Sequence, residues 1–201
     1  MPSLEQSVKS QFEKVFSDSD WKLFKEMAEL AFSEAAFLKK SDFNKVAEQK
    51  KLLVRNSRKR LLIGVGAELL LKAVYLKAGY CINRPQNERS PLRFPFSPAA
   101  AAGVPLNGAD TYMLGTLIDH LAGTVTLQHP PVVTEGLRIA KVFRNKEGHV
   151  VTATHRFEPQ SFRAIEAALV ELYADAFRER LTVRFSLAPR ERAAWRTAPL
   201  T

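Results

Sequence analysis

The chain has 201 residues and carries 30 Lys and Arg against 21 Asp and Glu, a net charge of +9. This length favours one domain, and the single cysteine excludes an intrachain disulfide and any metal site built from several cysteines, as expected for a reducing cytoplasm. The positive charge favours a polyanionic partner, although an acidic protein would also fit, and no apolar run is long enough to cross a membrane.

Two amphipathic helices are predicted at the beginning of the chain. In the first, apolar residues recur at helical spacing between positions 4 and 16. Residues 17–20 then offer side-chain oxygens that can cap the second helix. Its apolar residues recur every three or four positions from 21 to 38, so this helix is expected to face the core.

A long helical segment is predicted for residues 41–80, which contain no proline. One helix of this length would span roughly 60 Å, so we expect a bend or break at residues 55–57, where the apolar stripe lapses. Gly64 and Gly66 lower helix propensity but would let a second helix approach closely. Gly79 is expected to end the segment as its C-terminal cap.

The middle of the chain is predicted to be largely irregular. Five prolines between residues 81 and 109 indicate a long Pro-rich loop. Asp110 is then expected to cap a short helix over residues 113–121. Pro130 and Pro131 are expected to break the chain again.

The last predicted helix follows Pro159, and residues 182–187 favour a single strand. The sequence therefore predicts one mainly α-helical domain over residues 1–201. Its core should lie at about 21–177, with a C-terminal tail at 181–201.

Residues 139–149 contain polar side chains suited to phosphate chemistry. Asn145 directly follows Arg144, and His149 lies five positions after the arginine. An alternative structure for this region is a β-hairpin over residues 137–157, because its Val and Thr residues favour strands around an Asn-Lys-Glu-Gly turn. The two interpretations are compatible, since a hairpin would also hold Arg144 and His149 close together.

The pattern of Arg144, Asn145 and His149 ahead of a final helix resembles the signature of the HEPN family of helical ribonucleases, and the likeness covers about residues 21–177. It implies a HEPN-like helical bundle that cleaves RNA such as tRNA or mRNA, with no cofactor. It also implies a homodimer and a cognate antitoxin, in toxin–antitoxin or antiviral defence. In the family's long second helix an acidic residue often faces the site, and Glu68 takes that place here.

The residue types fit RNA cleavage without a metal. His149 can accept or donate a proton near neutral pH, Arg144 can bind phosphate oxygens, and Asn145 would position the phosphate or the imidazole. No histidine has an acidic or cysteine partner at metal-ligand spacing, so no metal site is predicted. Glu68 would orient Arg144, or alternatively pair with Lys72 four residues later.

A basic cluster on the long predicted helix could contact an RNA backbone, although a solvated helix face would have the same composition. Its members are Lys51, Arg55, Arg58, Lys59 and Arg60. Two alternatives to a nuclease stay open. One is a catalytically inactive HEPN-like module that binds RNA or protein, and the other is a structural helical interaction protein without affinity for nucleic acid.

Overall fold

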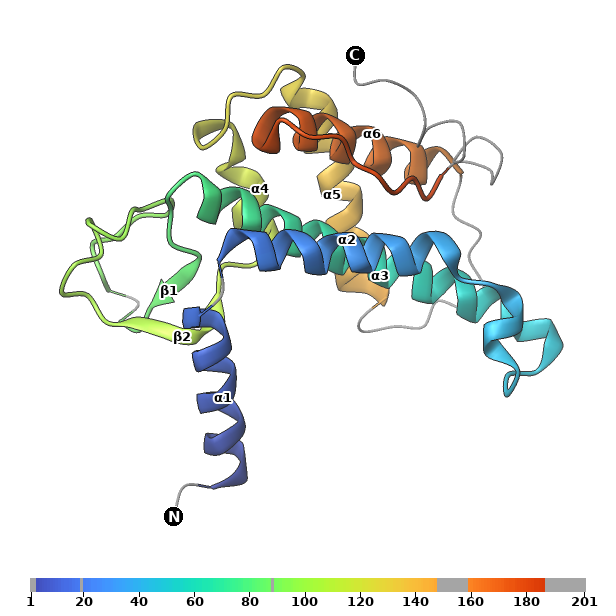
Figure 1. Cartoon of the computed structure of the whole chain (residues 1–201), viewed down its shortest axis with the longest axis horizontal. Coiled ribbons are helices and arrows are strands. Elements are labelled where there is room, and N and C mark those ends of the chain that lie inside the picture. The colour runs from blue at the N-terminus through green and yellow to red at the C-terminus, as the bar shows by residue number, and fades with distance from the viewer. Residues whose placement is uncertain (1–2, 19, 88, 148–158, 187–201) are drawn as a thin grey trace.

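The computed structural model describes residues 3–18, 20–87, 89–147 and 159–186. Within them the protein is mainly helical, as the sequence predicts, with six α-helices, two short 3-10 helices and one two-stranded antiparallel sheet. Figure 1 shows two long helices side by side, two further helices packed against them, and the small sheet at one end. No helix in these described ranges is both long and apolar enough to cross a membrane.

The central pair consists of α2 (Trp21–Phe37) and α3 (Glu48–Lys77), which run in opposite directions (Figure 1). A 3-10 helix, η1 (Lys40–Phe43), lies in the connection between them. Asp20 caps α2: its Oδ1 accepts hydrogen bonds from the backbone N–H groups two and three residues later, at 2.9 and 3.1 Å. The buried residues of α2 are Phe24, Ala28, Ala31, Phe32, Ala35 and Ala36.

The helix α3 is uninterrupted over 30 residues, so no break occurs at residues 55–57, where the sequence predicts a bend or break. The apolar stripe does lapse there, but polar contacts replace it. Ser57 and Arg60 both donate hydrogen bonds to the carboxylate of Glu147, which comes from another helix. These contacts hold that part of α3 against its neighbour. Gly79, with a φ of 83°, follows the end of the helix as predicted.

The second helical pair consists of α5 (Pro130–Glu147) and α6 (Pro159–Phe177). The two approach closely at Gly136, where an added Cβ would lie 2.4 Å from the Cβ of Ala168. Both helices begin with proline, which is tolerated there because a first-turn N–H has no intrahelical acceptor. The chain break expected at the two consecutive prolines is instead the start of α5.

The alternative β-hairpin over residues 137–157 is wrong for its first arm, because residues 137–147 belong to α5. A strand would bury every second residue. The buried residues here recur at helical spacing instead: Val133, Gly136, Leu137, Ala140, Phe143 and Glu147. The second arm lies outside the described residues.

The antiparallel sheet pairs β1 (Asn83–Pro85) with β2 (Leu106–Thr111), with a register irregularity along β1. The segment expected to be a long loop therefore contains one short strand and ends in another. A short helix, α4 (Leu114–Asp119), follows the sheet, and a second 3-10 helix, η2 (Leu121–Gly123), follows α4.

Two short segments differ from their sequence-based predictions. Asp110 does not cap α4, because it lies in β2 and pairs with Arg84 across the sheet at 3.4 Å; Met113 occupies the N-cap position. Residues 182–186 form no strand within the described part of the chain. They are held instead by backbone and side-chain hydrogen bonds to the buried carboxylate of Glu166.

The first helix, α1 (Leu4–Asp18), projects away from the helical pairs and contacts β2 (Figure 1). The helix predicted there is confirmed. Three of its apolar side chains are exposed: Leu4 is 82%, Val8 42% and Phe12 56% accessible. The core is therefore built by the helices that follow α1.

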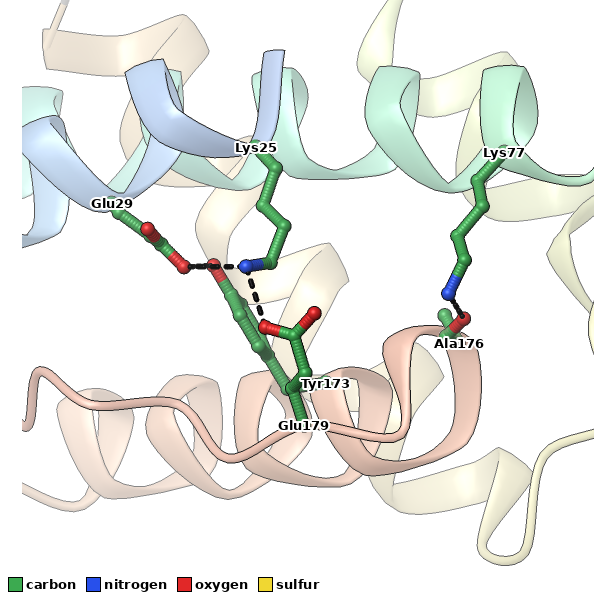
Figure 2. A network of polar contacts seen from close by, with 6 residues as sticks. All are labelled: Lys25, Glu29, Lys77, Tyr173, Ala176 and Glu179. Atoms are coloured by element: carbon green, nitrogen blue, oxygen red, sulfur yellow. Dashed lines mark hydrogen bonds and ion pairs between the residues drawn. The ribbon is translucent and has the colours of Figure 1, made fainter. Parts of the chain in front are cut away.

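Polar contacts fasten α6 and the residues just after it to α2, and α6 to the end of α3 (Figure 2). Lys25 Nζ lies 3.1 Å from Glu29 Oε1 and 2.7 Å from Glu179 Oε2. The buried phenol of Tyr173 donates a hydrogen bond to Glu29 at 2.9 Å. Burial raises the pKa of Tyr173, so the phenol stays protonated and remains a donor. Lys77 donates to a backbone carbonyl near the end of α6 at 2.9 Å.

Candidate functional site

Arg144 lies in the last turn of α5, at the place where this helix crosses α3. The crossing is close because α3 has a glycine there. A Cβ added to Gly64 would lie 2.6 Å from both the backbone nitrogen and the Cβ of Arg144. Any larger residue at position 64 would push the two helices apart. The predicted role of Gly64 in close helix approach is thereby confirmed.

Glu68 connects Arg144 to α3. Its Oε2 lies 2.9 Å from Arg144 Nε, and its Oε1 lies 3.0 Å from Lys72 Nζ. The two partners considered from the sequence are therefore present at once. The side chains of Glu68 and Lys72 are 13% and 8% exposed, whereas that of Arg144 is 38% exposed. The glutamate thus holds the Nε edge of the guanidinium and leaves its terminal nitrogens for other acceptors.

Asn145 contacts the same guanidinium, because Arg144 Nη1 donates to Asn145 Oδ1 at 3.4 Å. The structure therefore brings together Arg144, Asn145 and Glu68 at the end of α5. His149, the remaining member of the predicted set, lies outside the described residues, and so does His155.

Arg144 and Asn145 line a groove between α4 and α5, which we call the α4–α5 groove. It consists of two hollows of about 280 and 310 Å³. The hollows share Gly115, Asp119, Lys141 and Asn145, and the other polar lining residues are Thr116, Arg138, Arg144 and Lys146. Four of these side chains are cationic and one is anionic, so the groove carries net positive charge.

Glu147, which sequence reasoning did not single out, anchors the end of α5. Its carboxylate accepts hydrogen bonds from Ser57 Oγ and Arg60 Nε at 2.5 Å each, and the side chains of Glu147 and Arg60 are 1% and 3% exposed. The signal was present, because Glu147 lies seven positions after Ala140 on the buried face of α5. A charged residue on such a face needs a partner of opposite charge.

Two members of the predicted basic cluster are engaged inside the fold. Arg60 is buried against Glu147, so it does not present a cation to RNA, and its predicted role in RNA binding does not fit this placement. Lys59 donates to the backbone carbonyl of Phe185 at 2.7 Å and lies 5.0 Å from the centre of the Phe162 ring. Both residues join α3 to other parts of the chain.

The other three cluster residues have polar partners on the surface. Lys51 pairs with Glu48 at 2.7 Å, and Arg58 pairs with Glu34 of α2 at 3.1 Å. Arg55 donates to the side chain of the next residue at 3.2 Å. Two of these three cations, Lys51 and Arg58, are therefore paired with a carboxylate, whereas the partner of Arg55 is a neutral amide.

The histidines and carboxylates of the described residues offer no metal site. No group of three or more His, Cys, Asp or Glu side chains that could hold a metal ion occurs in these ranges. His120 bonds to a backbone carbonyl of α4 at 3.0 Å, and His129 pairs with Glu171 at 3.0 Å. Neither ring lines the α4–α5 groove.

The described residues thus define a mainly helical protein with a basic groove beside a fixed arginine. Compared with protein-family models, curated proteins and solved structures, the chain matches none. Its function is therefore inferred from the geometry of this groove and from the sequence.

Proposed function

We propose that the chain is a HEPN-like, metal-independent endoribonuclease with Arg144, Asn145 and His149 as its catalytic residues. The observation that carries the proposal is the ion pair between Arg144 and Glu68, which holds a half-exposed guanidinium beside a basic groove. A guanidinium held along one edge is suited to binding a phosphate, because its remaining N–H groups keep a defined direction.

The proposed reaction uses the nucleophile that RNA itself carries. The 2′-oxygen attacks the neighbouring phosphorus, the bond from phosphorus to the 5′-oxygen breaks, and the products are a 2′,3′-cyclic phosphate and a 5′-hydroxyl. His149 takes the 2′-hydroxyl proton or protonates the leaving 5′-oxygen. Arg144 stabilises the negative charge that builds on the phosphate oxygens, and Asn145 positions the phosphate.

The proposal includes a homodimer and a cognate antitoxin, as in toxin–antitoxin or phage-defence systems. Val142 and Met113, which line the α4–α5 groove, are 50% and 67% exposed. Exposed apolar side chains of this kind are suited to contact a partner surface. Sedimentation of the purified chain, alone and with the product of a neighbouring gene, measures both associations.

The decisive experiment is cleavage of total RNA and tRNA in the presence of EDTA. We expect wild type to cleave, and Arg144→Ala and His149→Ala to be slower by at least about 100-fold. Loss of a positioned proton donor or acceptor costs that much for His149, and loss of a donor to the charged transition state costs that much for Arg144. Arg89→Ala and His129→Ala, which remove the same residue types outside the groove, should cleave like wild type.

Each contrary outcome has a distinct meaning. If His149→Ala or Arg144→Ala cleaves as fast as wild type, the assignment of the site is wrong. If wild type binds RNA but does not cleave it, the chain is the catalytically inactive binding module. If it does not bind RNA even at low salt, it belongs to the class of helical interaction proteins.

A further inference from the structure

We propose that single-stranded RNA runs along the α4–α5 groove and that Lys141 binds the backbone phosphate next to the one held by Arg144. This inference rests on the proposed ribonuclease function. It places the line of cations that contact the RNA backbone, here called the track, on α5, whereas the sequence offers the basic cluster of α3 for that contact.

Lys141 lies one turn before Arg144 on α5. Residues three apart on a helix have Cβ atoms about 5–6 Å apart, so the two cations can contact one phosphate or two neighbouring ones. The glycine of α4 makes room for the lysine side chain, because a Cβ added to Gly115 would lie 2.7 Å from Lys141 Nζ. The ammonium group therefore lies against the wall of the groove beside Asn145.

Lys141 has no hydrogen-bond or ion-pair partner among the described residues. The members of the basic cluster on α3, by contrast, have such partners. Lys51 and Arg58 are already paired with glutamates, and Arg60 is buried against one. A phosphate that binds Lys141 displaces no internal ion pair. At Lys51 or Arg58 the neighbouring glutamate offsets part of the attraction for a phosphate.

The remaining charges extend the track in both directions. Arg138 lies one turn before Lys141, and Lys146 lies beyond Arg144. Asp119 is the one acidic residue that lines the groove, and its partner Arg138 is 3.8 Å away with both side chains largely exposed. An exposed pair of this kind is weak, so Asp119 repels an incoming phosphate and moderates the affinity of the groove.

The test measures binding of a fluorescent, 2′-O-methylated single-stranded RNA, which cannot be cleaved by 2′-OH attack. Lys141→Ala should bind about tenfold more weakly, the loss expected for one charge-assisted contact. The slope of log K against log salt concentration should become shallower by about 0.7, the value for one phosphate contact on a single strand. Lys141→Arg should retain most of the affinity.

Two further variants separate the groove from general effects of charge and folding. Lys45→Ala removes the same charge from an exposed position in the connection between α2 and α3, and it should change neither affinity nor salt slope. Asp119→Asn removes the acidic residue of the groove and should strengthen binding about threefold by abolishing a like-charge contact. A misfolded variant would not bind more tightly.

Unchanged binding by Lys141→Ala, or equal losses in Lys141→Ala and Lys45→Ala, would overturn the inference, and so would a wild type that does not bind RNA. Its failure is distinguishable from failure of the proposed function. If wild type cleaves RNA and Lys141→Ala binds RNA normally, only the proposed role of Lys141 is wrong. If Lys141→Ala loses binding and wild type does not cleave, only the proposed nuclease activity is wrong.

Discussion

At the level of single side chains, Glu68 lies between two cations. It contacts Arg144 on the groove side and Lys72 on the interior side, and both Glu68 and Lys72 are largely shielded from solvent. A largely buried carboxylate that contacts two cations stabilises the fold and orients Arg144 at the same time. These two roles can be separated by mutation, because Lys72 does not line the α4–α5 groove.

We predict that Glu68→Met lowers the free energy of unfolding by about 3 kcal/mol, because methionine offers no acceptor and leaves Lys72 charged and unpaired in a nearly buried position. Adding Lys72→Met to this variant removes that charge and should restore most of the stability in urea denaturation. Cleavage should stay reduced in the double variant, since Arg144 still has no acceptor at Nε. Glu135→Gln, an exposed substitution on α5, is the control.

A stable double variant that cleaves RNA at the wild-type rate would show that Glu68 does not position Arg144. The kinetic constants add a second criterion. Loss of an oriented transition-state contact should lower kcat more than it raises KM, whereas a general loss of folded protein lowers the apparent kcat in proportion to the folded fraction.

At the level of elements, the crossing of α3 and α5 depends on Gly64. We predict that Gly64→Ala destabilises the protein by about 2 kcal/mol through overpacking, although alanine gains up to about 1 kcal/mol in helix propensity. The added methyl would meet the backbone of Arg144, which cannot move without shifting α5. Urea denaturation followed by circular dichroism measures the change.

Gly115→Ala is the matched control, because the added methyl there would meet the flexible end of Lys141. A side chain of that length can move aside, so the free energy of unfolding should change by less than about 0.5 kcal/mol. Equal effects of the two substitutions would contradict the close backbone approach of α3 and α5.

The helices that sequence could predict are those with a clear apolar stripe and a capping residue. α2 begins after Asp20, and α6 begins at a proline, as expected. α5 was obscured by its two initial prolines and by Glu147 on its buried face, where the pattern predicts an apolar residue. β1 and β2 are short and contain proline or glycine, so no strand pattern marks them.

The candidate site, too, could be predicted only in part from the sequence. The place of Arg144 beside Glu68 was expected from the resemblance to HEPN ribonucleases and agrees with the observed ion pair. The position of Lys141 against α4 could not be predicted, because it depends on how Gly115, distant in sequence, packs on α5. Contacts between helices far apart in the chain are set by packing, which local periodicity does not encode.

At the level of the whole molecule, two buried tyrosines tie the peripheral helices to the central pair. Tyr75 of α3 donates to the backbone carbonyl of Leu117 in α4 at 2.7 Å, and Tyr173 of α6 donates to Glu29 of α2 at 2.9 Å. Both side chains are fully buried. Burial raises the pKa of Tyr75 to about 12 and also raises that of Tyr173. Each hydrogen bond requires the protonated phenol, so the fold depends on pH at the alkaline end.

We predict that the protein loses stability as pH rises above about 10, where tyrosines of the unfolded chain begin to ionise. In that range the unfolded state binds fewer protons than the folded state, so the free energy of unfolding falls by up to about 1.4 kcal/mol per pH unit for each buried tyrosine. Tyr75→Phe should be less stable than wild type by about 1 kcal/mol at neutral pH, the cost of one hydrogen bond. Between pH 10 and 12 its stability should fall less steeply than that of wild type. Urea denaturation at pH 8, 10 and 11.5 measures both slopes, and parallel slopes for the two proteins would show that Tyr75 ionises as easily in the folded chain as in the unfolded one.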